Sequence, residues 1–274
     1  MIDEELGAFL RHRRSLRQPQ DVGLPTGGRR RVPGLRREEL AIVAGVSPDH
    51  YQRIEQGRVR PSPQVVDALA TALALDNVER AHLHDLAGRG TAARSHSPTS
   101  TRSPSAQRRY QALADNFNGP AYVLDHRRDL IAWNRLAAAL HVDFATVPSR
   151  DRNMIWLILT DPVMRELYPD WQTAARTQVG LLRRASARFP EDRRIHDLIG
   201  RLSVRSPEFE RWWRLREVSE GTTGAKELRH PVAGLLRLDY HVLHPASAPG
   251  IEVFTYFTTD PETARKLDDL VGNP

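Results

Sequence analysis

The stretch LRREELAIVAGVSPDHYQRIEQGRVRPS, Leu35 to Ser62, decides how the first part of this chain folds. It predicts two short helices, Arg36 to Ala44 and Pro48 to Gln56, joined by a tight turn. Gly45 stands at that turn, where the chain needs a residue that tolerates positive φ. Ser47 directly precedes the second helix and is a good N-cap for it. The stretch therefore predicts a helix-turn-helix.

The second helix of the pair has one apolar side and one polar side. Tyr51 and Ile54 lie three residues apart and can face a common core. Its remaining side chains point outward and are mostly polar: Asp49, His50, Gln52 and Arg53. A short helix, a glycine turn and a second helix with an outward polar face are typical of a motif that reads DNA.

Three more helices are predicted around this pair. One covers residues 4–17, one begins after Ser62 and ends near Leu75, and one begins with Asn77 as its cap and ends near Ala87. The proline- and glycine-rich loop 18–34 carries Arg29, Arg30 and Arg31, either as a solvated basic loop or as an arm that contacts phosphates or a minor groove. We expect an all-α five-helix domain over residues 1–88.

The charge of the chain is concentrated in its first part. The 274 residues have a net charge of +6. Residues 1–110 hold 18 Arg and 12 acids, a difference of +6, whereas residues 111–274 hold 22 bases and 22 acids. A basic N-terminal part joined to a neutral one is typical of a DNA reader attached to a domain that does not touch DNA.

Composition also excludes some classes of site. The chain has no cysteine, which excludes disulfides, thiol catalysis and cysteine-ligated metal. Its charged N-terminus is not a signal peptide, and no apolar run has the length of a membrane span. We therefore expect a cytoplasmic protein without a membrane partner.

Residues 89–107 predict a flexible linker, because they are rich in Ser, Thr, Pro and Arg and contain no acid. The second domain then covers residues 108–274. It begins with two short strands in Ala121 to Asn134, continues with helices, and ends with strands in 226–229, 234–243 and 251–258 and a closing helix. Because strands at the two ends of a domain must pair, this pattern predicts an α+β fold.

Two resemblances support this organisation. The pattern EELAxxAGVSxxxxxRIEQGRxxPS resembles the Cro and phage-repressor (Xre) type of helix-turn-helix. The segments GPAYVLDHRRDLIAWNRLAAAL, RNMIWLILTDPVMRELYPDW, RSPEFERWW and RHPVAGLLRLDYHVL resemble the C-terminal domain of MmyB-like regulators of actinomycetes. The resemblance implies a PAS-like fold for that domain, which binds a small, largely apolar and fatty-acid-like effector. It also implies a homodimeric transcription regulator, bound to the nucleoid when it holds its double-stranded DNA operator.

The first resemblance implies a set of DNA-binding residues. Pro48, Asp49, His50 and Arg53 fall where the family reads bases, and Arg53 can donate two hydrogen bonds to a guanine. Phosphate contacts are expected nearby, and Glu55 is expected to pair with an arginine inside the domain. The full predicted set is Arg37, Ser47, Pro48, Asp49, His50, Gln52, Arg53, Arg58 and Arg60.

Candidates for the ligand site are aromatic side chains and a few polar ones that would orient an apolar ligand. They are Trp133, Asn134, Arg152, Asn153, Trp156, Arg184, Trp212, His230 and Tyr240. The aromatic residues can equally pack a core, and the two arginines can equally form salt bridges. His230 is expected to begin a strand.

The sequence predicts no catalytic residue, no metal site and no cofactor. It has no glycine-rich phosphate loop and no GxSxG motif, and its close histidine pairs do not share a face. Two other functions stay open for the C-terminal domain: a protein-interaction module without a small ligand, or an enzyme that acts on its ligand.

Overall fold

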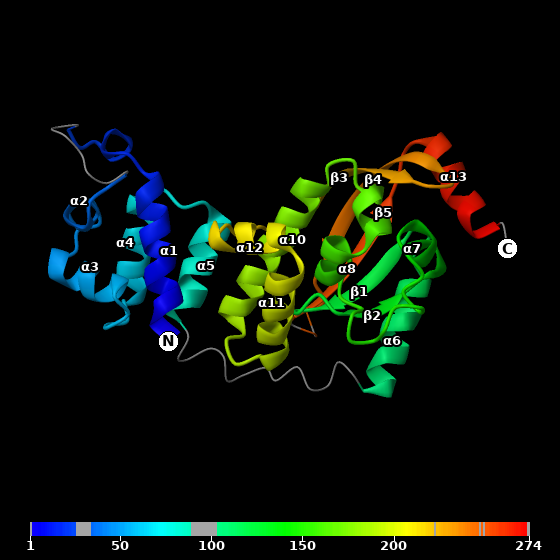
Figure 1. The fold of residues 1–274 in the computed structure, drawn as a ribbon, viewed down its shortest axis with the longest axis horizontal. Helices are drawn as coiled ribbons and strands as arrows, with labels where there is room; N and C mark the ends of the chain where they lie inside the picture. The colour runs from blue at the N-terminus through cyan, green and yellow to red at the C-terminus, as the bar shows by residue number, and fades with distance from the viewer. Residues whose placement is uncertain are drawn as a thin grey trace. The chain divides into compact units, whose positions relative to one another are not determined.

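The structure, a computed structural model, describes residues 2–25, 34–88, 103–221, 223–246, 248 and 250–272. By its internal contacts the chain divides into two units. The first consists of Met1–Arg94 with the segments Ser186–Glu191 and Arg214–Val218, and the second consists of the rest. Figure 1 labels the helices and strands named below, except η1 and α9.

The first unit contains the five predicted helices and one short 3₁₀ turn. They are α1 (Ile2–Leu16), η1 (Pro19–Val22), α2 (Arg37–Val43), α3 (Pro48–Glu55), α4 (Pro63–Ala72) and α5 (Asn77–Ala87). The turn between α2 and α3 has Gly45 at a φ of 67°, as the sequence predicts. The cap of α5 differs from the prediction: Asp76 accepts a hydrogen bond from the Glu79 amide at 2.8 Å, and Asn77 is the first helical residue. The predicted arm Arg29–Arg31 lies outside the described residues.

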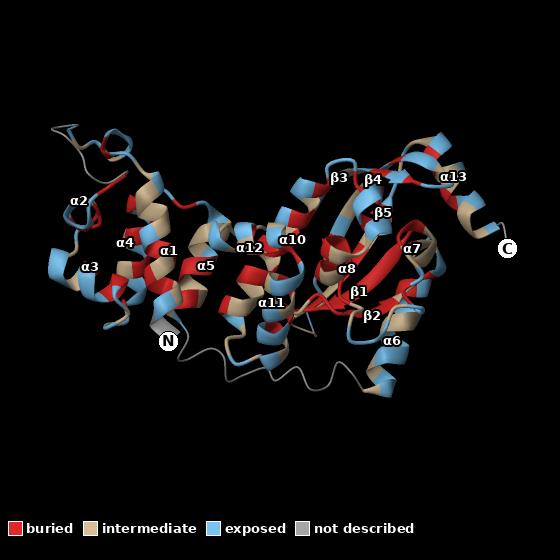
Figure 2. Ribbon diagram, in the orientation of Figure 1, coloured by how far each residue is buried: buried red, intermediate tan, exposed pale blue. Residues whose placement is uncertain are grey.

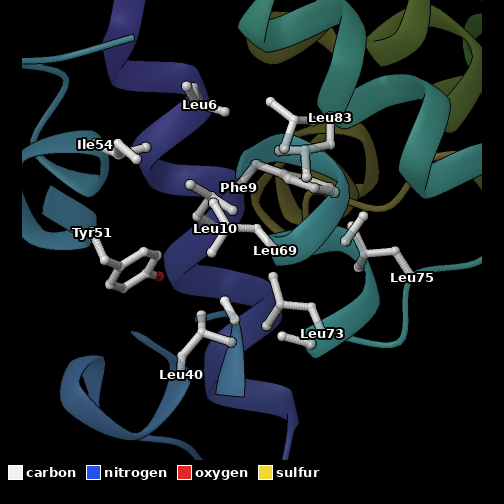
Figure 3. Packing of buried hydrophobic residues seen from close by; sticks show 14 of the residues in the cluster. Leu6, Phe9, Leu10, Leu40, Tyr51, Ile54, Leu69, Leu73, Leu75 and Leu83 are labelled. Atoms are coloured by element: carbon white, nitrogen blue, oxygen red, sulfur yellow. The ribbon is translucent and has the colours of Figure 1, made fainter. Parts of the chain in front are cut away.

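One apolar core holds these helices together. Figure 3 shows α1 side chains between those of α3 on one side and those of α4 and α5 on the other. Helix α1 also crosses α3 very closely at Gly7, where an added Cβ would lie 2.1 Å from the Glu55 carbonyl oxygen. Only glycine permits this approach, so Gly7 helps to set where α3 lies against α1.

The second unit is an α+β domain built on a five-stranded antiparallel sheet. Its strands are β1 (Ala121–Asp125), β2 (Leu130–Trp133), β3 (Thr223–His230), β4 (Gly234–Leu243) and β5 (Ile251–Phe257), in the order β2-β1-β5-β4-β3. The first and last strands pair, with Val123 opposite Val253, which confirms the prediction that the end strands meet. Strand β1 is buried along its whole length (Figure 2).

Helices precede the first strand of this unit, fill the long connection between β2 and β3, and follow the last strand. They are α6 (Pro104–Asp115), α7 (Arg135–Leu140), α8 (Met154–Thr160), α9 (Pro162–Leu167), α10 (Trp171–Arg188), α11 (Arg193–Arg205), α12 (Pro207–Arg214) and α13 (Pro261–Gly272). Helix α6 packs against β1 and β2, α9 against β3, and α13 against α7 and β4. Helix α6 begins at Pro104, inside the stretch 89–107 that composition predicts to be a linker, because Ser103 caps it by accepting from the Ala106 amide. No helix in the described part of the chain is long and apolar enough to cross a membrane.

Candidate DNA-reading surface and ligand cavity

Helix α3 presents the predicted polar face. Ser47 caps it by accepting a hydrogen bond from the His50 amide at 3.2 Å, and Tyr51 and Ile54 are buried beneath it. Its exposed side chains include Pro48, Asp49, Gln52 and Arg53. Asp49 lies one helical turn before Gln52 and Arg53, so these three side chains share one side of the helix. Within the described residues, the side chains of these last three make no hydrogen bond or ion pair. Their polar atoms are therefore available to a ligand, whereas the Ser47 hydroxyl already serves the helix.

Glu55 anchors this helix from inside. Its carboxylate is buried and accepts from Arg14 Nε at 3.2 Å and from Arg37 Nε at 2.9 Å. This confirms the prediction that Glu55 pairs with an arginine of its own domain. Arg37 is predicted to contact phosphate. Its Nε is already used in the ion pair with Glu55, but 47% of its side chain remains exposed.

Two more predicted phosphate contacts lie just after α3. Arg58 and Arg60 are exposed, and His50 is half-buried. The structure therefore gathers the nine predicted DNA-binding residues at α2, α3 and the segment that follows them, and their contacts with DNA remain a prediction.

The predicted ligand residues of the second unit are more scattered. Asn134 and Asn153 are buried, and both amides are fully used by the fold. The Asn134 Oδ1 accepts from the amides of Ala121 and Ala137, and its Nδ2 donates to the Gly119 carbonyl. The Asn153 Oδ1 caps α8, and its Nδ2 donates to the Arg127 carbonyl and to Asp129.

The predicted tryptophans pack against arginines or other rings. The Arg152 guanidinium lies over Trp133, with its carbon 5.7 Å from the ring centre, and that of Arg201 lies over Trp156 at 4.0 Å. Trp212 packs against Trp171. These contacts give each ring a structural role.

The remaining polar candidates are also engaged. Arg152 donates to the carbonyls of Val147 and Ala145, and Arg184 pairs with Glu220 at 3.4 Å. The expectation that His230 begins a strand is wrong. It ends β3, and its ring closes the following turn by accepting from the amides of Val232 and Ala233 while donating to the Ala139 carbonyl.

A cavity of about 320 Å³ lies between α10 and strands β3, β4 and β5. Of the nine predicted ligand residues, Tyr240 is the one in its lining. Other side chains that define its character are Arg128, Tyr168, Gln178, Lys226 and Phe254. Aromatic rings and a few polar groups around one hollow are typical of a small-molecule site.

Lys226 is the most unusual group in this cavity. Its Nζ lies 4.7 Å from the ring centre of Tyr240, 5.0 Å from Phe254 and 5.6 Å from Tyr168. In the described chain its amine has no carboxylate partner. Burial, and secondarily the charge of Arg128, lowers the pKa of Lys226 to about 8.

Arg128 supplies a second cation to the same cavity. It ends the β1–β2 turn with a φ of 69°, which the hydrogen bond from its amide to the Asp125 carbonyl holds in place. Its Nη1 pairs with Glu252, but its Nε is buried and has no partner among the described residues. The cavity therefore holds cationic donors that the fold itself does not satisfy.

The sequence carries a signal for Lys226. Along β3 the alternation places Lys226 on the same face as Leu228 and His230, which are both buried. It is also one of only two lysines, with Lys266, in a chain that otherwise uses arginine. A lysine on the buried side of a strand, in a chain that has only two lysines, is therefore the sequence feature that could have pointed to this cavity.

Comparisons with known families agree with both units. The profile described as "MmyB-like transcription regulator ligand binding domain" matches residues 103–270, and that of a "Helix-turn-helix domain" matches residues 5–83. No curated protein matches the chain. Among the described residues, no group of His, Asp and Glu side chains is arranged to hold a metal ion.

Proposed function

This chain belongs to the MmyB-like transcription regulators, and from that premise we propose that α3 reads an operator while the cavity around Lys226 binds the controlling effector. The observation that carries the proposal is that two sets of polar side chains have hydrogen-bonding atoms without a partner among the described residues. One is the exposed face of α3, and the other is the cationic end of the cavity. We propose that the protein acts in the cytoplasm, where the DNA lies.

The reading step uses the exposed side of α3. Arg53 donates two hydrogen bonds to a guanine, Asp49 accepts from a cytosine amino group, and Gln52 lies between them on the same face. Arg58 and Arg60 hold phosphates and make binding depend on salt. Because one such helix covers only a half-site, the protein binds as a homodimer to a two-fold operator.

The effector is a small, largely apolar acid. Tyr168, Tyr240 and Phe254 pack its apolar body, while the Lys226 ammonium and the Arg128 Nε hold its carboxylate. At about 30 Å³ per water-sized group, 320 Å³ holds roughly ten non-hydrogen atoms, as many as octanoic acid has. Fatty-acid-like compounds of medium length therefore fit the cavity.

Two measurements test these roles. Genomic mapping of bound sites gives the operator, and Arg53→Ala then abolishes preference for it over unrelated DNA. Arg58→Ala, the matched control, weakens binding to both sequences and reduces the salt slope by about one. If Arg53→Ala keeps the operator preference of the wild type, α3 does not read the bases as stated.

Extraction of the purified protein, followed by mass spectrometry, tests the effector. A stoichiometric, unmodified acid supports sensing. A protein that converts added octanoic acid is an enzyme instead, and one that binds no acid and retains a protein partner is an interaction module. Both of those outcomes contradict the proposal.

A further inference from the structure

One polar group in the cavity is not used by a simple fatty acid. Gln178 lies on α10, 6% exposed, and belongs to the cavity lining. Its Oε1 is buried and has no hydrogen-bond partner, and its Nε2 donates to no atom in the described parts of the chain. Because neither end of this amide is paired, it offers a carbonyl acceptor and an NH2 donor group to a ligand, whichever way it is turned.

Three other polar groups of the lining are already engaged. Asp170 accepts from the Thr173 amide at 3.1 Å, Thr177 Oγ1 donates to the Thr173 carbonyl at 2.9 Å, and Glu227 pairs with Arg237 at 3.0 Å. Among the described residues, Lys226, Arg128, Gln178 and the Tyr240 hydroxyl keep a polar atom without a hydrogen-bond partner. A carboxylate satisfies the two cations, but an alkyl chain beside Gln178 leaves its amide unpaired, which is costly in a buried place.

We propose that Gln178 is a specificity residue and that the effector is a hydroxy acid, whose hydroxyl pairs with the Gln178 amide. A hydroxyl both donates and accepts, so one hydroxyl pairs with the amide oxygen and with one of the two amide N–H groups. This inference rests on the proposed function, because it assumes that the cavity binds an acid. It adds a second polar requirement, which an unsubstituted fatty acid does not meet.

The test compares matched acids on the full chain by titration calorimetry at pH 7. The ligands are octanoic acid and its 2-, 3- and 4-hydroxy derivatives, because the series scans the hydroxyl along the chain. In the wild type, at least one hydroxy acid binds about 10- to 100-fold more tightly than octanoic acid, as expected for two hydrogen bonds made in a buried site. In Gln178→Leu that preference falls below about threefold, while octanoic acid binds at least as tightly as to the wild type.

The control is Gln172→Leu, the same change at an exposed position of α10 outside the cavity lining. It keeps the wild-type preference. The inference is overturned if octanoic acid binds the wild type as tightly as every hydroxy acid, or if Gln178→Leu retains the preference. If none of the acids binds, the proposed function itself fails, and the role of Gln178 falls with it.

Discussion

Replacing Lys226 by methionine has two opposite consequences. Methionine keeps the length of the side chain and the contact with the rings, but removes the charge. In the folded protein the pKa of Lys226 falls from 10.5 to about 8, so the fold disfavours the ammonium. At about 1.4 kcal/mol per pKa unit, the fall from 10.5 to about 8 means that the charged lysine costs the ligand-free protein about 3 to 4 kcal/mol at neutral pH. Lys226→Met therefore raises the free energy of unfolding at pH 7 by that amount.

The pH dependence has a definite sign. Because the pKa is lower in the folded state, the unfolded chain holds more protons between pH 8 and pH 10.5. Wild-type stability therefore rises with pH across this window, and the cost is fully present below pH 8. The advantage of Lys226→Met is largest at pH 7 and disappears as the pH passes 10.5.

Ligand binding changes in the other direction. The variant loses a charge-assisted hydrogen bond to the carboxylate, so octanoic acid binds about 10- to 100-fold more weakly at pH 7. Above pH 8 the wild type loses affinity by about tenfold per pH unit, because binding requires the ammonium, whereas the variant shows no such fall. Urea denaturation at pH 7 to 10.5 and calorimetric titration at pH 7 to 9 measure both effects.

Lys266→Met is the matched control, because Lys266 is the only other lysine and lies on α13, paired with Glu262 outside the cavity. It leaves octanoic acid affinity unchanged. Easier unfolding of Lys226→Met than of the wild type at pH 7, together with wild-type affinity for octanoic acid, would contradict the role given to Lys226.

Three further changes test the fold. Ser47→Ala removes the α3 cap and lowers the free energy of unfolding by about 1 kcal/mol in urea denaturation. Gly7→Ala places a Cβ against the Glu55 carbonyl and costs at least about 1 to 3 kcal/mol by the same assay, whereas Gly200→Ala, in open space on α11, is neutral or stabilising. Burial lowers the pKa of His141 to about 4, so thermal melts show stability falling as the pH drops from 6.5 to 4, and His141→Phe makes that dependence weaker.

The helix-turn-helix could be predicted almost completely, because its signals are local. A cap at Ser47, a turn at Gly45 and the spacing of Tyr51 and Ile54 each act within a few residues. The partner of Glu55 could be predicted only as a type of residue, since Arg14 lies 41 positions away.

The cavity around Lys226 could not be predicted in the same way, because its polar groups come from separate elements. Arg128 ends a turn, Gln178 lies on a helix, and Lys226 belongs to a strand almost 100 residues after the turn. Choosing ligand residues by aromatic character selected Trp133 and Trp156, whose faces are covered by arginines. What distinguishes the cavity is the lack of partners, and only the fold reveals which polar groups remain unpaired.

The positions of the two cations bear on what an effector can do to this domain. Among the described strands, β3 lies at an edge of the sheet and pairs with β4 alone, whereas Arg128 belongs to the turn at the other side, between β1 and β2. An acid held by both Lys226 and Arg128 joins β3 to that turn directly, across the strands that separate them. It also offsets the cost of the unpaired ammonium, which is present only while Lys226 faces the cavity. On the proposed function, an acid held in this way stabilises the described arrangement of β3, and it can shift the domain only by its difference in affinity between this arrangement and any other.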